Sequence, residues 1–567
     1  DLRSFLPPGL GLLALVAGLI AACVVVEETT ADSDQTTSTG QGGMVGSGGQ
    51  GGGGGTLPAT CWFDELELKS FNTEGPFGIN RHALADDFTL PLRGGESWTF
   101  SENFSSCDNY VFLTNARNNS DLDSTSVWAR DIDQLFWRSP PNVHYFFVPA
   151  RNNADAPAEI EALATVIADS LAKADEATAA YWAPRMHVAA GHSSSIGGWL
   201  TTILAGQGRA GFGIDRRQQV RLLGSFADVT RYNSQLKAAD KWPWVNNMSY
   251  AAHEARQYNY EAKRDARLAA EEGVTIVTAW EGEVLKHWVE KEIEFPDAAA
   301  MATFDTLEID LWMDCADPNG PEFGSCGAWD YLSHIYLKDE AEPDKKTELA
   351  RFITTYHREG RYIVDVTPMM VHLLKGGKRT LRFDISPEWN QQAYLTKMDF
   401  RFSNRGKGYA PRQATFLYSG GSFNDSYNDQ FSPIDVPISA EAKRVELWVV
   451  ISGHGMKTGN CAEFCRHQHE FTIGTAKYME DHETVGNQEG CIDEIENGMV
   501  PNQGGTWWFG RGGWCPGQQV EPWIVDVTND VTPGETATIS YKAYLNGNPP
   551  PADSGNIVMT SYLVVHE

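Results

Sequence analysis

The chain has 567 residues, more than one compact core usually contains, so we expect roughly two to four domains. Its 75 acidic and 45 basic residues give a formal net charge of −30, and no run of Lys or Arg interrupts this acidity. A surface of that sign repels polyanions, which excludes nucleic acid as a partner. The 18 Trp residues supply flat apolar faces of the kind that stack on sugar rings.

The amino-terminal segment resembles an export signal. Arg3 precedes an apolar run that is short for a membrane span and ends in "LIAAC". This ending resembles a bacterial lipobox, which predicts a signal peptide at residues 1–22 and a lipid on Cys23. An ordinary signal peptide cleaved nearby is the alternative. The lipidated form would be exported and held at the outer membrane or cell surface of a bacterial envelope by its lipid alone.

Residues 23–56 continue as a polar and then Gly-rich stretch, which cannot bury enough apolar surface to fold. We interpret it as a flexible tether. Of the nine cysteines, eight remain when Cys23 is set aside for lipid, and an even number suits disulfides in an oxidising compartment.

Residues 57–275 mix strand-like and helix-like runs, which predicts βαβ units and a layered α/β domain. The strand-like runs are 109–114 and 143–150, the helix-like runs are 126–139 and 157–174, and the stretches 184–191 and 212–224 follow. The stretches "DDFTLPLRGGESWTF" and "FGIDRRQQVRLLG" resemble thioredoxin-like proteins of the peroxiredoxin type.

That family uses a cysteine just after the strand "NYVFLT", where this chain reads "NARNNSD". Without a thiolate there, redox chemistry has no nucleophile, so we predict a redox-inactive domain without a C-x-x-C motif. Cys61 and Cys107 flank the region and more plausibly form a structural bridge.

Two other stretches of this region receive structural interpretations. "AGHSSSIGGWL" places His192 beside Ser193 but does not match a nucleophile elbow, so we expect a Ser/Gly-rich loop. The charged run 259–273 is typical of a helix with a solvated face.

After residue 275 the pattern changes to short runs that alternate polar and apolar residues, separated by turn-forming residues. These runs are 289–297, 305–313, 333–338, 348–357, 362–370, 379–386, 393–403, 444–453 and 537–545. Their number and the length of the region predict two all-β sandwiches side by side, at 276–408 and 409–567.

Five stretches of this half carry a family resemblance. They are "CGAWDYLSHIYL", "RFITTYHREGRYIVDVT", "ISGHGMKTGNCAEFC", "GTWWFGRGGWCPG" and "VDVTNDVTPGETATISYKAYLNG". Over about residues 285–567 they resemble the peptide-N-glycosidase F family, whose members release N-glycans. The resemblance implies two eight-stranded jelly rolls with the active site between them. It also implies the disulfides Cys315–Cys326, Cys461–Cys465 and Cys491–Cys515.

The stretch "CAEFC" allows three interpretations. Zinc would use Cys461, Cys465, His467 and His469, but structural zinc ligands usually come as two spaced pairs. Redox disulfides usually have C-x-x-C spacing. In an extended strand the two cysteines would lie about 13 Å apart, whereas a disulfide needs Cα atoms within about 7 Å, so a disulfide here requires a sharp turn. We favour such a clip, with Glu463 at its centre, whose effect is positional because so small a ring stabilises by only about 2 kcal/mol.

The resemblance implies three catalytic acids. Asp330 matches the principal catalytic aspartate of the family, and Glu463 matches a glutamate on the peptide side of the cleft. The third family acid stands two residues before a tryptophan, where this chain has Pro387. Glu388 is therefore displaced by one position, and Asp384 is a weaker candidate.

The resemblance also implies substrate-binding residues. Arg511 would stabilise charge on the carbonyl oxygen, and four tryptophans would line the sugar slot. Those tryptophans are Trp329, Trp389, Trp508 and Trp514. Tyr331 and His454 stand where the family has Arg and Trp, so glycan contacts would differ there.

These features predict a surface-anchored peptide-N4-(N-acetyl-β-glucosaminyl)asparagine amidase acting on N-linked glycoproteins or glycopeptides. We expect a monomer without a metal or organic cofactor. One alternative is a non-catalytic glycan-binding lipoprotein on the same scaffold. Another is a copper monooxygenase of the same paired-sandwich architecture, for which His467 and His469 supply one ligand pair and no second set is evident.

Overall fold

The structure is a computed structural model, which describes residues 60–115, 128, 131–149, 156–206, 211–232, 244–455, 461–552 and 555–567. The predicted signal peptide, Cys23 and the tether to residue 56 lie outside these residues. No helix among the described residues is long and apolar enough to cross a membrane.

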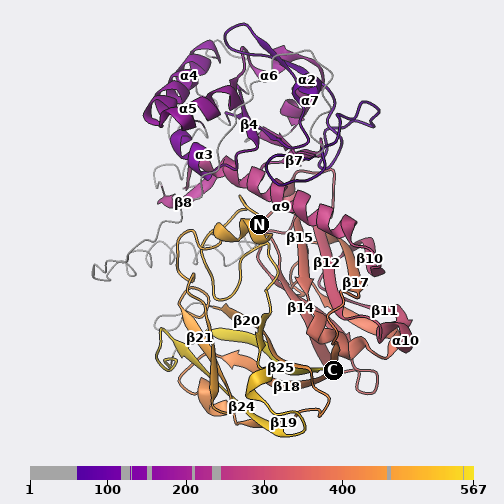
Figure 1. The fold of residues 1–567 in the computed structure, drawn as a ribbon. Helices are drawn as coiled ribbons and strands as arrows, with labels where there is room; N and C mark the ends of the chain where they lie inside the picture. Colours follow the sequence, from indigo (N-terminus) through magenta and orange to yellow (C-terminus); the bar gives the residue numbers. More distant parts are fainter. Residues whose placement is uncertain are drawn as a thin grey trace, which may run out of the picture. The chain divides into compact units, whose positions relative to one another are not determined.

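A five-stranded sheet forms the centre of the amino-terminal region, with the strand order β5-β4-β3-β6-β7. The strands are β3 (Asn109–Thr114), β4 (Val143–Val148), β5 (Met186–Val188), β6 (Gly211–Ile214) and β7 (Val220–Leu222). β3, β4 and β5 are parallel, and β6 and β7 are antiparallel. Parallel neighbours need crossover segments, which here contain the helices α3 (Ile132–Arg138), α4 (Ala156–Lys173) and α5 (Glu176–Trp182) (Figure 1). The predicted βαβ units are therefore confirmed, and the likeness to thioredoxin-like proteins stays a prediction.

The predicted loop at 190–200 is wrong in part. Two helices, α6 (Ser193–Ile196) and α7 (Gly198–Gly206), occupy this stretch. Leu200 and Ile203 of α7 are buried in the core of the α/β domain, so apolar packing overrides the poor helix propensity of Ser and Gly.

The helix α9 (Ala251–Ala270) follows a short hairpin of β8 (Ala227–Tyr232) and β9 (Trp244–Asn246). Its predicted solvated face is wrong in part, because Lys263 and Arg267 are exposed but other charged residues are not. Glu261 and Arg264 are only 2% and 5% exposed, because Glu261 accepts a hydrogen bond from Arg221 of the α/β domain and Arg264 pairs with Asp310 of the first sandwich. Charged side chains of this helix therefore pair with opposite charges on the α/β domain on one side and on the first sandwich on the other.

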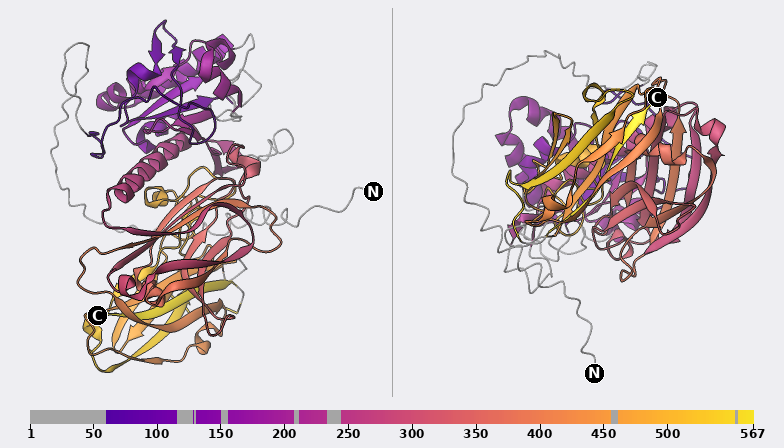
Figure 2. Two further views of the ribbon diagram at one scale, coloured as in Figure 1. Left: turned by 90° about the vertical axis from the view of Figure 1, so that its right-hand side faces the viewer. Right: turned by 90° about the horizontal axis from the view of Figure 1, so that it is seen from below.

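β1 (Thr89–Pro91) and β2 (Ser97–Thr99) form a separate two-stranded sheet. The strands from β10 onward form two sandwiches, each with two four-stranded antiparallel sheets (Figure 2). The first has the sheets β10-β17-β12-β15 and β11-β16-β13-β14, and the second has β18-β25-β20-β23 and β19-β24-β21-β22. Numbered within each sandwich, both read 1-8-3-6 and 2-7-4-5, the strand order of a jelly roll. The predicted pair of jelly rolls is confirmed.

The strands of the first sandwich are β10 (Thr275–Leu285), β11 (Trp288–Asp297), β12 (Thr306–Cys315), β13 (Leu332–Lys338), β14 (Lys346–Ile353), β15 (Gly360–Asp365), β16 (Gly376–Asp384) and β17 (Tyr394–Ser403). Those of the second are β18 (Pro411–Ser422), β19 (Ile434–Pro437), β20 (Arg444–His454), β21 (His467–Ile473), β22 (Ala476–Asp481), β23 (Trp523–Asp526), β24 (Thr536–Leu545) and β25 (Asn556–His566). Every one of the nine predicted runs overlaps a strand. The clearest omissions are β10, β18, β21 and β25.

The apolar core of the first sandwich extends to one face of the second, which also has a separate core of its own. Trp448 and Tyr562 of the second sandwich belong to the same buried cluster as Leu311 and Phe352 of the first. A backbone bridge between Phe352 and Gln519 joins them as well. Because a shared close-packed core resists sliding, loops at this boundary are held at fixed separations.

Arg358, in the loop between β14 and β15, ties the α/β domain to both sandwiches. Its guanidinium is 6% exposed and donates to Glu254 of α9 at 2.9 and 3.2 Å and to Glu322 at 3.1 Å. It also donates to the carbonyls of Leu222 and Pro501. Burial of this cation is tolerated because its donors meet two carboxylates and two carbonyls.

Replacement of Arg358 by Gln removes the cation that pairs with buried Glu254 and leaves buried Glu322 with Arg81 alone. We expect the free energy of unfolding to fall by about 3–5 kcal/mol, measured by denaturant titration. Arg93→Gln is the matched control, because Arg93 pairs with Glu161 on the exposed surface, and its unfolding should match that of the unmodified protein. Equal stability of the two variants would contradict the tie.

Candidate functional site

Asp330 lies in the loop between β12 and β13, and its backbone is held from both sides. The Thr354 hydroxyl accepts a hydrogen bond from the Tyr331 N–H at 2.8 Å and donates to the Trp329 carbonyl at 2.6 Å. The Thr354 N–H donates to the Tyr331 carbonyl. One threonine therefore fixes the residues on either side of the aspartate.

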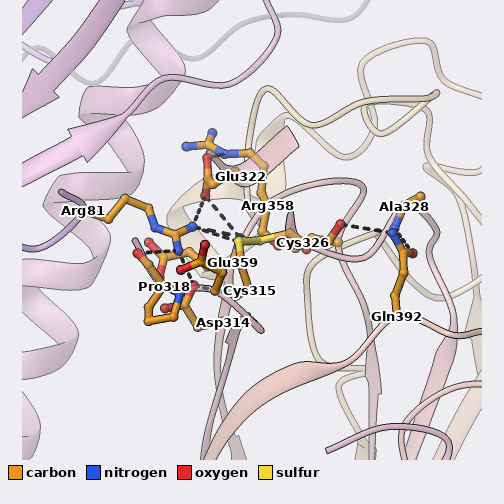
Figure 3. The surroundings of a disulfide bond; sticks show 12 residues. Arg81, Asp314, Cys315, Pro318, Glu322, Cys326, Ala328, Arg358, Glu359 and Gln392 are labelled. Atoms are coloured by element: carbon orange, nitrogen blue, oxygen red, sulfur yellow. Dashed lines mark hydrogen bonds and ion pairs between the residues drawn. A yellow bond between two sulfur atoms is a disulfide. The ribbon is translucent and has the colours of Figure 1, made fainter. Parts of the chain in front are cut away.

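The disulfide Cys315–Cys326 closes the same loop (Figure 3). Arg81 of the α/β domain donates to Cys315 Sγ at 3.0 Å and pairs with Asp314 at 2.9 Å. On the other side, Gln392 accepts a hydrogen bond from the Ala328 N–H at 2.7 Å. The loop that carries Asp330 is thus anchored along most of its length.

Glu463 is held by the predicted clip. Cys461 and Cys465 are bonded to each other with their Cα atoms 5.2 Å apart, and the N–H groups of Phe464 and Cys465 both donate to the Cys461 carbonyl. The chain therefore makes a sharp turn with Glu463 inside it. The zinc interpretation through these cysteines is wrong, because sulfurs joined in a disulfide are not thiolate ligands.

Two glycines let this turn lie close to its neighbours. A Cβ atom on Gly512 would stand 2.4 Å from the Ala462 carbonyl oxygen, and one on Gly453 would stand 2.1 Å from it. The Gly512 N–H donates to the Glu463 carbonyl at 2.8 Å, and the Gly453 N–H donates to the Gly512 carbonyl at 2.7 Å. The Glu463 turn therefore packs closely against strand β20 and the loop that carries Arg511, and the three form one unit.

Arg511 lies between the two acids. It is 2% exposed, its Nε donates to Glu463 Oε1 at 3.2 Å, and its Nη2 lies 3.7 Å from Asp330 Oδ2. Further hydrogen bonds reach the Phe509 carbonyl and Thr506 Oγ1, and the guanidinium carbon lies 4.8 Å from the Trp514 ring centroid. Asp330 belongs to the first sandwich and Glu463 to the second, so one cation joins carboxylates from both.

Burial raises the pKa of both carboxyl groups. For Asp330, the Arg511 charge and a hydrogen bond from Tyr356 lower the pKa and so limit this rise. For Glu463 burial raises the pKa, Arg511 opposes the rise and the Asp330 charge adds to it. Two partly buried acids around one cation, each with a raised pKa, are an arrangement suited to proton transfer.

Glu388 lies apart from this group. It is exposed and accepts a hydrogen bond from the Trp288 indole at 3.2 Å. Asp384 pairs with Lys346 and Arg382 instead. Neither acid shares the Arg511 contacts that join Asp330 and Glu463.

The predicted substrate-binding rings divide into exposed and buried ones. Trp329 is 49% exposed and Trp389 is 70% exposed, and Tyr331 packs edge-on against Trp389. Trp514 is buried beneath Arg511 and stacks on His454. Trp508 is 1% exposed within a cluster that reaches Tyr250 of the α/β domain, which leaves it no free face for a sugar.

All four predicted disulfides are present. They are Cys61–Cys107, Cys315–Cys326, Cys461–Cys465 and Cys491–Cys515.

Two site residues were not singled out from the sequence. Tyr356 is 9% exposed, hydrogen-bonds Asp330 and lies edge-on to Trp329. Thr354 positions the backbone around Asp330. Both lie in "RFITTYHREG", a stretch that carries the family resemblance, so their place in the motif was the available signal.

Comparison with known proteins relates this chain to one family of enzymes. Residues 422–564 match the family described as "Peptide-N-glycosidase F, C terminal". The chain is therefore related to the peptide-N-glycosidase F family.

A curated relative is peptide-N(4)-(N-acetyl-β-D-glucosaminyl)asparagine amidase F of Elizabethkingia miricola. It is 25% identical over 290 residues, which cover 46% of this chain and 73% of the relative. Among solved structures, PNGase F from Flavobacterium meningosepticum aligns with a TM-score of 0.41 and 19% identity over 52% of this chain and 96% of its own. PNGF-II aligns with a TM-score of 0.39 and 13% identity over 54% of this chain and 67% of its own.

Replacement of Gly512 by Ala forces a methyl group against the Ala462 carbonyl and the His467 ring. We expect the free energy of unfolding to fall by about 1–3 kcal/mol, measured by denaturant titration. In the control Gly421→Ala, the new Cβ atom meets its neighbours at 3.5 Å or more, so stability should change little. A Gly512→Ala variant as stable as the control would show that the turn is loosely packed.

Proposed function

We propose that this chain is a peptide-N-glycosidase, which hydrolyses the amide between an asparagine side chain and N-acetylglucosamine. The products are aspartate in the peptide and a 1-amino sugar. The observation that carries the proposal is the convergence of Asp330 and Glu463, from two sandwiches, on the buried Arg511. The family relationship supports the same reaction.

Asp330 is proposed to act on the attacking water. A carboxylate with a raised pKa accepts a proton more readily than an ordinary aspartate, and its backbone is fixed by Thr354 and Gln392. The water proton passes to Asp330 as the water oxygen bonds to the amide carbon. The same carboxyl group then returns the proton to the leaving nitrogen.

Glu463 and Arg511 are proposed to orient the asparagine side. Glu463 is 21% exposed at the side chain and is held by its disulfide turn, so it presents a carboxylate in one place. Arg511 contributes a positive charge toward the carbonyl oxygen as that oxygen becomes negative. It also keeps the two carboxyl groups more acidic than burial alone would leave them.

The exposed rings of Trp329 and Trp389 are proposed to stack on the sugars of the core glycan. Glu388, between Trp288 and Trp389, is proposed to bind sugar hydroxyls. We also propose the exported form lipidated at Cys23, in which residues 24–56 hold the amidase away from the membrane on a flexible tether. We further propose that the α/β domain is a thioredoxin-like domain without redox activity.

Replacement of Asp330 by Asn should lower kcat on an N-glycopeptide by about 100- to 10,000-fold, the usual range for loss of a general base. The measurement is the mass change from Asn to Asp in the peptide. Glu463→Gln should reduce kcat/KM as well, whereas Asp384→Asn is the control and should retain activity, since Asp384 pairs only at the surface of the sandwich.

If the unmodified protein leaves the peptide mass unchanged, as Asp330→Asn does, the amidase proposal fails. Retained binding of the glycopeptide in that case would identify a non-catalytic glycan-binding protein.

The acid limb of the pH profile of kcat/KM should lie above the ordinary aspartate range, because burial raises the pKa of Asp330 and activity requires the ionised form. Arg511→Gln removes a charge that lowers this pKa, so the limb should move to higher pH. Arg511→Lys keeps the charge, and its limb should stay near that of the unmodified protein. A limb that moves to lower pH in Arg511→Gln would refute the assigned interaction.

A further inference from the structure

Three buried imidazoles lie directly behind the Glu463 turn. His467 and His469 stand two residues apart on one face of β21, and His482 follows the paired strand β22. One ring nitrogen of each lies within 4.8 Å of those of the other two. His467 and His469 are 0% exposed and the His482 side chain is 9% exposed.

These rings are chemically ready to be ligands. An uncharged imidazole has one unprotonated nitrogen, and this is the nitrogen that binds a metal ion. His482 Nε2 is buried without a hydrogen-bond partner among the described residues. Buried polar atoms are rarely left in this state without a ligand or another compensating contact.

The far side of one ring has a hydrogen-bond partner that can orient a histidine ligand. His469 Nδ1 lies 2.7 Å from the Tyr541 hydroxyl, which lies 3.0 Å from the Tyr427 hydroxyl. Such an outer partner fixes which His469 nitrogen carries the proton and which faces the ion. His482 Nδ1 lies 3.9 Å from Glu480 Oε1, which is too far for a hydrogen bond.

We propose that His467, His469 and His482 bind one divalent transition-metal ion of the Zn²⁺ or Cu²⁺ type. Three neutral imidazoles suit these ions, and the Cys461 and Cys465 sulfurs take no part. His467 Nδ1 and His469 Nε2 lie 2.7 Å apart and share a proton in the metal-free chain. When the ion binds, each ring keeps one proton on its outward nitrogen, which in His469 faces the Tyr541 hydroxyl.

The site is structural, because its ligands are enclosed and Asp330 is not among them. A Cβ atom on Gly513 would stand 2.7 Å from His482 Cε1, and the Ala462 carbonyl and Gly512 both lie against His467 Nε2. An ion here therefore stiffens the backing of the Glu463 turn and of the Arg511 loop together. The inference is independent of the proposed amidase function.

The test is metal analysis of the full chain, purified without metal-affinity resin, stripped with a chelator and titrated separately with Zn²⁺, Cu²⁺ and Co²⁺. We expect one ion per chain, a rise in Tm on adding Zn²⁺, and the visible absorption of imidazole-bound Co²⁺. His482→Gln should lose all three signals, whereas His192→Gln, a histidine outside the cluster, should keep them.

If neither Zn²⁺, Cu²⁺ nor Co²⁺ binds the stripped unmodified protein stoichiometrically and its Tm does not rise, the three rings form a hydrogen-bonded core and the metal site is refuted. Unchanged binding in a folded His482→Gln variant would refute it equally. Should His482→Gln not fold, the Co²⁺ spectrum of the unmodified protein decides, because it reports imidazole ligation directly.

Discussion

A single buried guanidinium governs the site. Arg511 cannot lie at 2% exposure without anionic partners, and the partners it has are carboxylates from different sandwiches. The acids in turn are destabilised by burial in their charged form, and the cation compensates them. Each of the three groups would be unfavourable alone, so the position of each depends on the other two.

The scaffold keeps this arrangement at fixed distances. The shared apolar core prevents the two jelly rolls from sliding, and a disulfide closes the loop or turn beneath each acid. Thr354 positions the backbone beside Asp330 through hydrogen bonds, and Gly512 lets the Glu463 turn lie close to its neighbours because it has no side chain. Positioning at this level is what acid–base chemistry requires, because proton transfer depends on atoms being within hydrogen-bond reach.

Much of the architecture could be predicted from local pattern. Strands such as β12 and β20 consist largely of buried residues. The family resemblance implied three of the disulfides, and the fourth, Cys61–Cys107, was predicted because these cysteines flank the amino-terminal region. β21 was missed because "HQHEFTI" reads as polar, although its histidines are buried. The burial of charged α9 residues and the α6–α7 helices were also missed, because both depend on partners far away in sequence.

In the candidate site, too, only residues that stand in a recognisable motif could be predicted from the sequence. Asp330, Glu463 and Arg511 each stand in a recognisable motif, and the structure brings them together. Tyr356 and Thr354 lack a chemical signal of their own, since a hydroxyl that contacts a carboxylate or a backbone group looks like any other in the sequence. Trp508 illustrates the opposite case, in which a residue suited to sugar stacking is used for packing between domains.

The ion pairs of α9 and Arg358 have a consequence for how this protein can change. A shortened chain beginning at the first jelly roll would leave Arg358 without Glu254 and Asp310 without Arg264, and would expose the charged surface that the amino-terminal region covers. The amino-terminal region therefore cannot be exchanged or deleted as a detachable module. It has to evolve together with the sandwiches, one matched pair of charges at a time.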